Sequence, residues 1–309
     1  MKRRDFLRNS LLGTAGLTVL GGLGSSAVAA GKAPVKLTIL HTNDMHSRIE
    51  PFPASDRQFG NMGGMARRAT LVSQIRAQEP NVLLLDSGDI FQGTPYFNFF
   101  GGELEFKLMT QMGYDASTLG NHDFDNGLEG LKKQLPHAGF PFLSANYDFS
   151  QTILAGQFKP YKVFEKQGLR IGVFGIGLQL AGLVSDRNFG ATKYLDPYQT
   201  AKNMVQQLRG PEKCDMVICL SHLGYKYESA KPDDLKLAAQ VAGIDLILGG
   251  HTHTFLDQPV PVQDPNGRRT LVNQVGWSGI NLGRLDYIFE LGSRRPAVAA
   301  TTVLPVREV

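Results

Sequence analysis

Residues 35–46 read VKLTILHTNDMH and carry an apolar segment that ends in an Asp-x-His triplet. The run over residues 35–40 predicts a buried strand, and Asp44-Met45-His46 follows where that strand gives way to a loop. Four more segments repeat the arrangement: Asp86-Ser87-Gly88-Asp89 after residues 81–85, Gly120-Asn121-His122-Asp123 after 116–119, Ser221-His222 after 216–220, and Gly249-Gly250-His251-Thr252-His253 after 244–248. Open α/β sheets bind ligands at the carboxyl ends of their strands, so we expect the five segments to meet there.

Helical patterns alternate with these strands along the chain. Helices are expected at residues 65–77, 104–112, 128–135, 197–208 and 233–241, and further strands at 140–145, 161–165, 169–176, 270–275, 285–290 and 302–305. Apolar strands that alternate with helices predict an α/β fold whose sheets are buried on both faces. The length of 309 residues and a hydrophobic share of 42% are ample for a core, and we expect residues 31–309 to form one domain.

The net charge of +4 is concentrated at the start of the chain. Lys2, Arg3, Arg4 and Arg8 stand there against Asp5, which leaves 28 basic and 27 acidic side chains in the remainder. This nearly equal number of basic and acidic side chains does not indicate a surface for nucleic acid or for anionic membranes. We therefore expect neither a nucleic-acid partner nor stable membrane insertion.

Residues 1–30 have the pattern of a signal peptide, with a basic start, an apolar run over 11–24 and small residues at 27–29. Such an apolar run is too short to span a bilayer comfortably, which takes about 20 residues. Residues 2–8, KRRDFLR, also resemble the twin-arginine consensus, the alternative being an ordinary secretion signal with a chance Arg-Arg pair. We expect export to a bacterial periplasm or beyond it.

The two cysteines, Cys214 and Cys219, are five positions apart on a predicted buried strand. Side chains at that spacing face opposite sides of a strand and lie about 16 Å apart. A disulfide between them is therefore excluded. Buried structural thiols are favoured over metal ligands.

The five polar segments hold five of the seven histidines, together with aspartates and an asparagine. Carboxylate, amide and imidazole groups are ligands of hard and borderline divalent metals. Asp44 and His46, like His251 and His253, are two residues apart, so in extended backbone each pair points one way and can reach one ion. The sequence predicts a two-metal hydrolytic site, and its donor types suit Zn, Mn and Fe alike.

The order Asp-x-His, Gly-Asp, Gly-Asn-His-Asp, His and Gly-His-x-His resembles that of the calcineurin-like metallophosphoesterases. Residues 41–46, 86–94, 120–127 and 249–254 are similar in particular to the 5'-nucleotidase and UDP-sugar hydrolase branch. The resemblance covers nearly all of residues 31–309 and implies a catalytic domain with a four-layer α/β/β/α sandwich around two central mixed sheets. It implies one metal ion at Asp44, His46 and His253, a second at Asn121, His222 and His251, and Asp89 bridging the two. A carboxylate has two oxygens and can hold two cations about 3.5 to 4 Å apart.

The same resemblance implies a catalytic pair beside the metals. His122 would stabilise the phosphoryl transition state and protonate the leaving oxygen, while Asp125 would accept a hydrogen bond from its other ring nitrogen. Three further residues are weaker candidates: Asp86 and Asp123 are expected to orient ligands or loops, and His41 to be either structural or functional. His137 fits no motif and is expected to be a surface residue.

The implied function is hydrolysis of phosphate esters, 5'-nucleotides or related nucleotide phosphates, by a metal-bridging hydroxide that attacks in line with the leaving alcohol. Hydrolysis of 2',3'-cyclic nucleotides or UDP-sugars stays open. So does a thiosulfohydrolase, a class that resembles this family and uses twin-arginine export. From a different class, the chain would be the inactive binding subunit of a split nucleotidase. A metallo-β-lactamase type of site is disfavoured because the chain lacks the clustered His-x-His-x-Asp-His pattern.

Members of the resembling branch usually continue into a second domain that binds the base, whereas this sequence stops near Val309. We therefore expect either a broad phosphoesterase with an open metal site or a separate subunit that replaces the second domain and docks over the metals. Exposed-looking side chains in two loops are candidates for that contact: Phe52, Phe59, Leu180 and Phe189.

Overall fold

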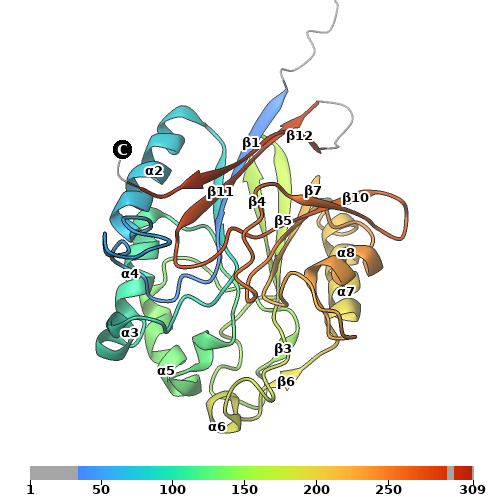
Figure 1. Ribbon diagram of the computed structural model, residues 1–309. Helices are drawn as coiled ribbons and strands as arrows, with labels where there is room; N and C mark the ends of the chain where they lie inside the picture. The colour runs from blue at the N-terminus through green and yellow to red at the C-terminus, as the bar shows by residue number, and fades with distance from the viewer. Residues whose placement is uncertain (1–33, 291–295, 308–309) are drawn as a thin grey trace, which may run out of the picture. The chain divides into compact units, whose positions relative to one another are not determined.

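The computed structural model describes residues 34–290 and 296–307, and the expected signal peptide at residues 1–30 lies outside them. Two large sheets pack face to face, and helices cover the outer face of each, which gives the layers α/β/β/α (Figure 1). The expected fold class is confirmed.

Each of the two large sheets is mixed. The first has the order β12 (Pro296–Pro305), β11 (Asn281–Phe289), β1 (Val35–Thr42) and β2 (Val82–Asp86). The second has the order β4 (Tyr161–Lys166), β5 (Leu169–Ile176), β7 (Met216–Ser221), β8 (Leu246–Leu248), β10 (Arg269–Asn273) and β9 (Val260–Gln263), and a small third sheet pairs β3 (Tyr147–Asp148) with β6 (Lys193–Tyr194). Strands β1 and β2 run parallel, as do β5, β7, β8 and β10, so their carboxyl ends point the same way within each sheet.

The helices of the described chain follow the strands that they cover. They are α2 (Met65–Gln78), α3 (Pro95–Phe100), α4 (Glu103–Met112), α5 (Gly127–Gln134), α6 (Asp186–Phe189), α7 (Pro197–Arg209) and α8 (Asp234–Gln240), with 3-10 turns at His122–Phe124 and Leu135–His137. Helix α7 has proline at its first position, and the side chain of Asp196 accepts a hydrogen bond from the backbone N–H of Gln199 at 2.7 Å. The first N–H groups of a helix have no partner within the helix. Proline has no N–H to leave unpaired, and the Asp196 carboxylate accepts a hydrogen bond from one of the others.

Three apolar clusters fill the spaces between the layers. The central cluster lies between the sheets and joins Leu37 and Leu83 of the first sheet to Ile171 and Ile218 of the second. A second cluster packs α2 and α4 against the outer face of β1 and β2, and a third packs α7 and α8 against β5, β7 and β8. Strands β1, β2, β7 and β8 are buried on both faces, as strands between helical layers must be.

Two expected strands are wrong. Residues 116–119 and 140–145 pair with their neighbours only through single bridges, Leu85 with Ala116, Ser117 with Phe142, and Leu143 with Lys159. The side chains of Ser117 and Thr118 bond to Asp86 and to the carbonyl of Leu143. These side-chain bonds add to backbone bonds of the same segment, such as Ser117 N–H to the carbonyl of Pro141 at 3.1 Å and Leu143 N–H to that of Ser117 at 2.8 Å.

Two further expectations concern the cysteines and the membrane. Cys214 and Cys219 are buried and unbridged, as expected, although Cys214 lies just before β7 and not within it. Among the described residues, every helix is too short or too polar to cross a bilayer.

Candidate metal centre

The carboxyl ends of β1, β2, β7 and β8 bring the polar segments together in two groups. Asp44, His46 and His253 form the first group, and Asp89, His222 and His251 the second. Within each group the possible ligand atoms all lie within 4.8 Å of one another. Each group therefore has the size and the donor types of a divalent-metal site.

Asp89 lies between the two groups. Its Oδ2 atom is 3.1 Å from His222 Nε2 in the second group and 3.9 Å from His46 Nε2 in the first. The contacts within the first group are similar, with His253 Nε2 3.4 Å from Asp44 Oδ1. A single carboxylate so placed can serve two cations.

The backbone at five of these residues is left-handed, and this corrects one expectation. Positive φ angles occur at Asp44 (51°), His46 (48°), Asp89 (54°), His251 (74°) and His253 (51°). Residues other than glycine rarely adopt them, and the strain is typical of functional sites. The expected extended backbone is therefore wrong, although Asp44 and His46 share one group as expected. His251 and His253 belong to different groups.

Hydrogen bonds to backbone carbonyls fix the tautomer of two histidines. His46 Nδ1 lies 3.2 Å from the carbonyl oxygen of Phe91, and His222 Nδ1 lies 2.6 Å from that of Ser87. Because a carbonyl can only accept, each Nδ1 carries the proton and donates it. The Nε2 lone pairs are left facing the groups, as metal coordination requires.

The electrostatics of the second group favour a positive charge. Burial lowers the pKa of His222, but the carboxylates of Asp89 and Asp44 outweigh it and raise that pKa to about 10. Burial also opposes ionisation of Asp89, yet His222 and His46 hold its pKa below the ordinary value. The pKa of His251 falls to about 4, through burial and then through the charge of His222. A proton on His222 thus offsets the negative charge of Asp89 and Asp44, and a bound cation would offset the same charge.

Unsatisfied atoms point to the same conclusion. Asn121 Oδ1 is buried and has no hydrogen-bond partner among the residues that the structure describes. His222 Nε2 is also buried, and it lies 3.1 Å from Asp89 Oδ2 without forming a hydrogen bond of regular geometry. In the first group, His46 Nε2 and His253 Nε2 face each other at 2.9 Å. Since His46 is protonated on Nδ1, that contact needs a proton or a cation between the two rings. The residues present therefore fit the two divalent ions that the sequence predicts.

His122 stands beside both groups on their accessible side. Its Nδ1 lies 2.8 Å from Asp125 Oδ2, and its ring centroid is 5.3 Å from that of His46. Hydrogen bonding to Asp125 raises the pKa of His122 more than burial lowers it, and the charge of Asp89 adds to the rise. The side chains are 37% and 29% exposed, so the pair is open to an incoming molecule.

Asp86 and Asp123 join the site loops to one another. Asp123 accepts hydrogen bonds from the backbone N–H groups of Asp89 (3.1 Å), Ile90 (3.0 Å) and Gly120 (2.8 Å), and Asp86 accepts one from Gly88 at 3.0 Å. Burial and the neighbouring carboxylate of Asp89 raise the pKa of Asp123 to about 7. Both aspartates hold loops in place, which is the role expected for them.

Glycine is required where two of these loops touch. A Cβ atom at Gly120 would lie 2.1 Å from Asp89 Oδ1, and one at Gly88 would lie 2.6 Å from the backbone nitrogen of Gly120. Gly88 also has a φ of 86°. Neither position has room for a side chain while Asp89 keeps its place.

Three residues of the site were not anticipated. Asn43 donates to Asp44 Oδ2 and to the carbonyl of Gly276, both at 2.6 Å. Asp234 is buried beside Ser221 and Gln274, and burial raises its pKa to about 7. Trp277 stacks on His253, with ring centroids 5.5 Å apart and an interplanar angle of 4°. Only Asn43 adjoins a recognised motif, so only Asn43 carried a usable signal in the sequence.

The two remaining histidines lie away from the groups. His41 is completely buried in β1, and its Nε2 accepts a hydrogen bond from Asn273 at 2.9 Å, which indicates a structural role. His137 is half-exposed and lies 3.9 Å from Glu103. Of the loop residues considered for a docking contact, Phe52 and Leu180 are buried, against expectation, whereas Phe59 and Phe189 are partly exposed.

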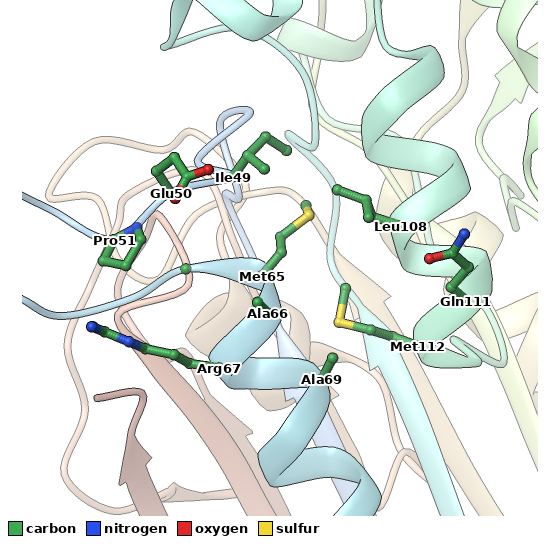
Figure 2. Close-up of a pocket in the computed structure, with 11 residues that line it drawn as sticks. Ile49, Glu50, Pro51, Met65, Ala66, Arg67, Ala69, Leu108, Gln111 and Met112 are labelled. Carbon is green, nitrogen blue, oxygen red and sulfur yellow. The ribbon is translucent and has the colours of Figure 1, made fainter. Parts of the chain in front are cut away.

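A cavity of about 600 Å³ lies between α2 and α4 and does not belong to the site. Figure 2 shows Met65, Ala66 and Ala69 on one side of it and Leu108 and Met112 on the other. None of the residues that line it belongs to either metal-binding group. Its walls are mainly apolar, and it offers no cluster of metal ligands.

Comparison with known proteins agrees with this geometry. Residues 37–255 match the family model of the calcineurin-like phosphoesterases. A 5'-nucleotidase of Vibrio cholerae is 37% identical over 94% of this chain and 56% of its own length. A snake venom 5'-nucleotidase of Crotalus adamanteus is 36% identical over 85% of this chain and 47% of its own. The chain thus spans about half the length of these curated relatives.

A solved structure of a 5'-nucleotidase precursor is also similar to this chain. The crystal structure of a 5'-nucleotidase precursor from Thermus thermophilus superposes with a TM-score of 0.79 and 34% sequence identity. The match covers 88% of this chain and 54% of that one.

Proposed function

We propose that this chain, which belongs to the calcineurin-like phosphoesterase family and is a metal-dependent phosphoester hydrolase, acts on 5'-nucleotides or related nucleotide phosphates. One observation carries the proposal: two groups of possible metal ligands adjoin at Asp89, which lies 3.1 Å from His222 and 3.9 Å from His46, and the partly exposed His122–Asp125 pair stands beside them. The names of the similar proteins support the choice of nucleotides.

The proposed ligands divide as the resemblance implies. Asp44, His46 and His253 would hold one divalent ion, and Asn121, His222 and His251 the other, with Asp89 shared. Such a pair of ions supplies Lewis acidity to phosphoryl oxygens and lowers the pKa of an attacking water. The choice among Zn, Mn and Fe stays open, because all three accept these donors.

The chain's own residues would then position the substrate and move one proton. Asp125 holds the Nδ1–H of His122, so the other ring nitrogen is free to meet the leaving oxygen. The raised pKa keeps His122 protonated further toward neutral pH, where it can donate to the departing alkoxide. The backbone N–H of His122 also donates to Asp89 Oδ1 at 2.7 Å, which couples the acid to the ligand between the groups.

A substrate panel tests this proposal. Purified protein of known metal content would be given 5'-nucleotides, a 2',3'-cyclic nucleotide, a UDP-sugar and a thiosulfonate. Release of phosphate, of nucleoside monophosphate or of sulfate would be measured for the substrate that can yield it. The proposal predicts the highest kcat/KM for 5'-nucleotides. Turnover of the cyclic diester, the UDP-sugar or the thiosulfonate alone would contradict it and select the corresponding alternative.

Export is also proposed, on the sequence of residues 1–30 alone. A reporter that folds before transport should reach the periplasm when fused to this segment, and Arg3→Lys with Arg4→Lys should retain it in the cytoplasm. Export that persists in the double lysine variant would indicate an ordinary secretion signal.

A further inference from the structure

Four aromatic rings continue outward from the first metal-binding group. Trp277 lies parallel to the ring of His253, as described above, and meets the edges of Phe52 at 5.8 Å and of Phe59 at 6.3 Å between centroids. Phe59 in turn stacks on Phe255, at 5.8 Å and an interplanar angle of 18°. We call Phe59, Phe255 and Trp277 the aromatic shelf, and Phe52 lies buried next to it.

The shelf exposes aromatic surface next to the site. Phe255 is 42% exposed, and Phe59 and Trp277 are partly exposed, as is the side chain of His253 at 38%. The shelf and the first group therefore form one continuous accessible surface. Exposed rings that adjoin a site for a charged group offer a second contact to a ligand that has an apolar part.

The shelf is also rigidly connected to the metal ligands. The backbone N–H of Ser278 donates to the carbonyl of Asp44 at 2.7 Å, and that of Gly276 donates to Thr254 at 3.0 Å. Trp277 is therefore held between two backbone anchors. A Cβ atom at Gly276 would lie 2.2 Å from the ring of Phe255, so this glycine allows the ring to pack against the chain. The shelf is thus built in place before a ligand arrives.

The chemistry of the shelf selects a flat and uncharged group. Its three members are aromatic, and the guanidinium of Arg48 lies 4.2 Å from the ring of the buried Phe52, which is outside the shelf. A ligand that contacts both the metal-binding groups and the shelf must carry a phosphoryl group at one end and a planar ring at the other. A nucleoside 5'-phosphate has this construction, and each of its bases presents a π-face that stacks on an aromatic ring.

We infer that Phe255, Phe59 and Trp277 form a subsite that stacks on the base of the substrate while its phosphoryl group lies at the two metal-binding groups. The inference rests on the proposed nucleotide specificity and deepens it. Recognition by stacking depends on the π-face and not on hydrogen-bonding edges. The subsite therefore tolerates purines and pyrimidines alike, and the residues of the shelf contribute to base binding.

The first test separates base contacts from catalysis. Phe255→Ala should raise the KM for a 5'-nucleotide by roughly 5- to 30-fold, the lower part of the range for loss of one base stack. Its kcat should stay within about twofold, and the KM for ribose 5-phosphate, which has no base, should not change. Phe255→Tyr should restore the low KM. Phe99→Ala, which removes an 81% exposed phenylalanine from α3, is the matched control and should change nothing.

A KM for ribose 5-phosphate that rises as much as the KM for the nucleotide would show that Phe255 only supports the fold. An unchanged nucleotide KM in Phe255→Ala would overturn the subsite. Both results are distinct from failure of the proposed function, which would appear as an unaltered enzyme that cleaves base-free esters but no nucleotide.

The second test does not depend on turnover. Trp277 is the only tryptophan in the chain, so its fluorescence reports on the shelf. Adenosine, which has no phosphate to cleave, should quench this emission in a saturable way, whereas ribose should not. Phe255→Ala should weaken adenosine binding by the same factor as it raises the nucleotide KM. No quenching up to the solubility limit of adenosine would overturn the inference, whatever the enzyme hydrolyses.

Discussion

Replacement of His122 by alanine should slow the chemical step and leave the metal ligands in place. His122 is proposed as the general acid, and loss of such a group costs about 10² to 10⁴ in turnover. The side chain is 37% exposed, so water can partly replace it as a proton donor. We therefore expect a fall of about 10² to 10³ in kcat for a 5'-nucleotide, in the lower part of that range.

Asp125→Asn should have a smaller effect of the same kind. The hydrogen bond from His122 to Asp125 is 2.8 Å long and charge-assisted, a type worth about 1.5 to 3 kcal/mol when buried. Exposure of both side chains reduces this to about 1 kcal/mol, or roughly a fivefold loss of kcat. Because Asp125 raises the pKa of His122, the activity of the variant should decline at a lower pH on the alkaline side.

The assay should compare two leaving groups. A nucleoside departs as a poor leaving group that needs a proton, whereas 4-nitrophenolate needs none. His122→Ala should therefore depress nucleotide hydrolysis far more than 4-nitrophenyl phosphate hydrolysis, with metal content unchanged by elemental analysis. Equal losses for both substrates would refute the role as acid. Loss of metal from the variant would show His122 to be a ligand.

Two further predictions concern the loops and the core. Gly120→Ala should lower metal content and turnover together, because its Cβ would lie 2.1 Å from Asp89 Oδ1; full metal binding by this variant, measured by elemental analysis, would contradict the geometry. Burial lowers the pKa of His41 to about 3, so on acidification below about pH 6.5 the unfolded chain takes up a proton that the folded chain refuses. Stability should fall by up to about 1.4 kcal/mol per pH unit from this residue alone, and urea unfolding of metal-free His41→Gln should show a correspondingly flatter dependence between pH 6.5 and 4; an identical slope would refute it.

The sequence predicted the layers and the ends of the main strands well. Strands such as β2 and β7 are apolar up to their last residue because both faces are buried, and this pattern can be read from the sequence. The polar residues that follow them were expected to meet, and the structure does bring them together. Whether each of those residues binds metal or takes part in catalysis stays a prediction.

What the sequence could not show depends on local backbone and on distant contacts. His251 and His253 belong to different groups, and both have left-handed backbone, which a sequence motif does not encode for residues other than glycine. The segment at residues 116–119, Ala-Ser-Thr-Leu, was expected to be a strand, yet it pairs only through single bridges at Ala116 and Ser117. Trp277 reaches His253 from 24 residues further along the chain, and no motif marks it.

Metal content measured beside turnover tests the two-metal site most directly. Protein stripped with a chelator and reloaded with Mn²⁺ should hold two ions per chain and regain phosphoesterase activity. Asp89→Asn keeps the shape of the ligand between the groups but removes its charge, and His222→Ala removes a buried ligand. Both variants should lose bound metal and turnover together, while the exposed control Asp257→Asn should keep both. Two ions per chain and full activity in Asp89→Asn or His222→Ala would contradict the site.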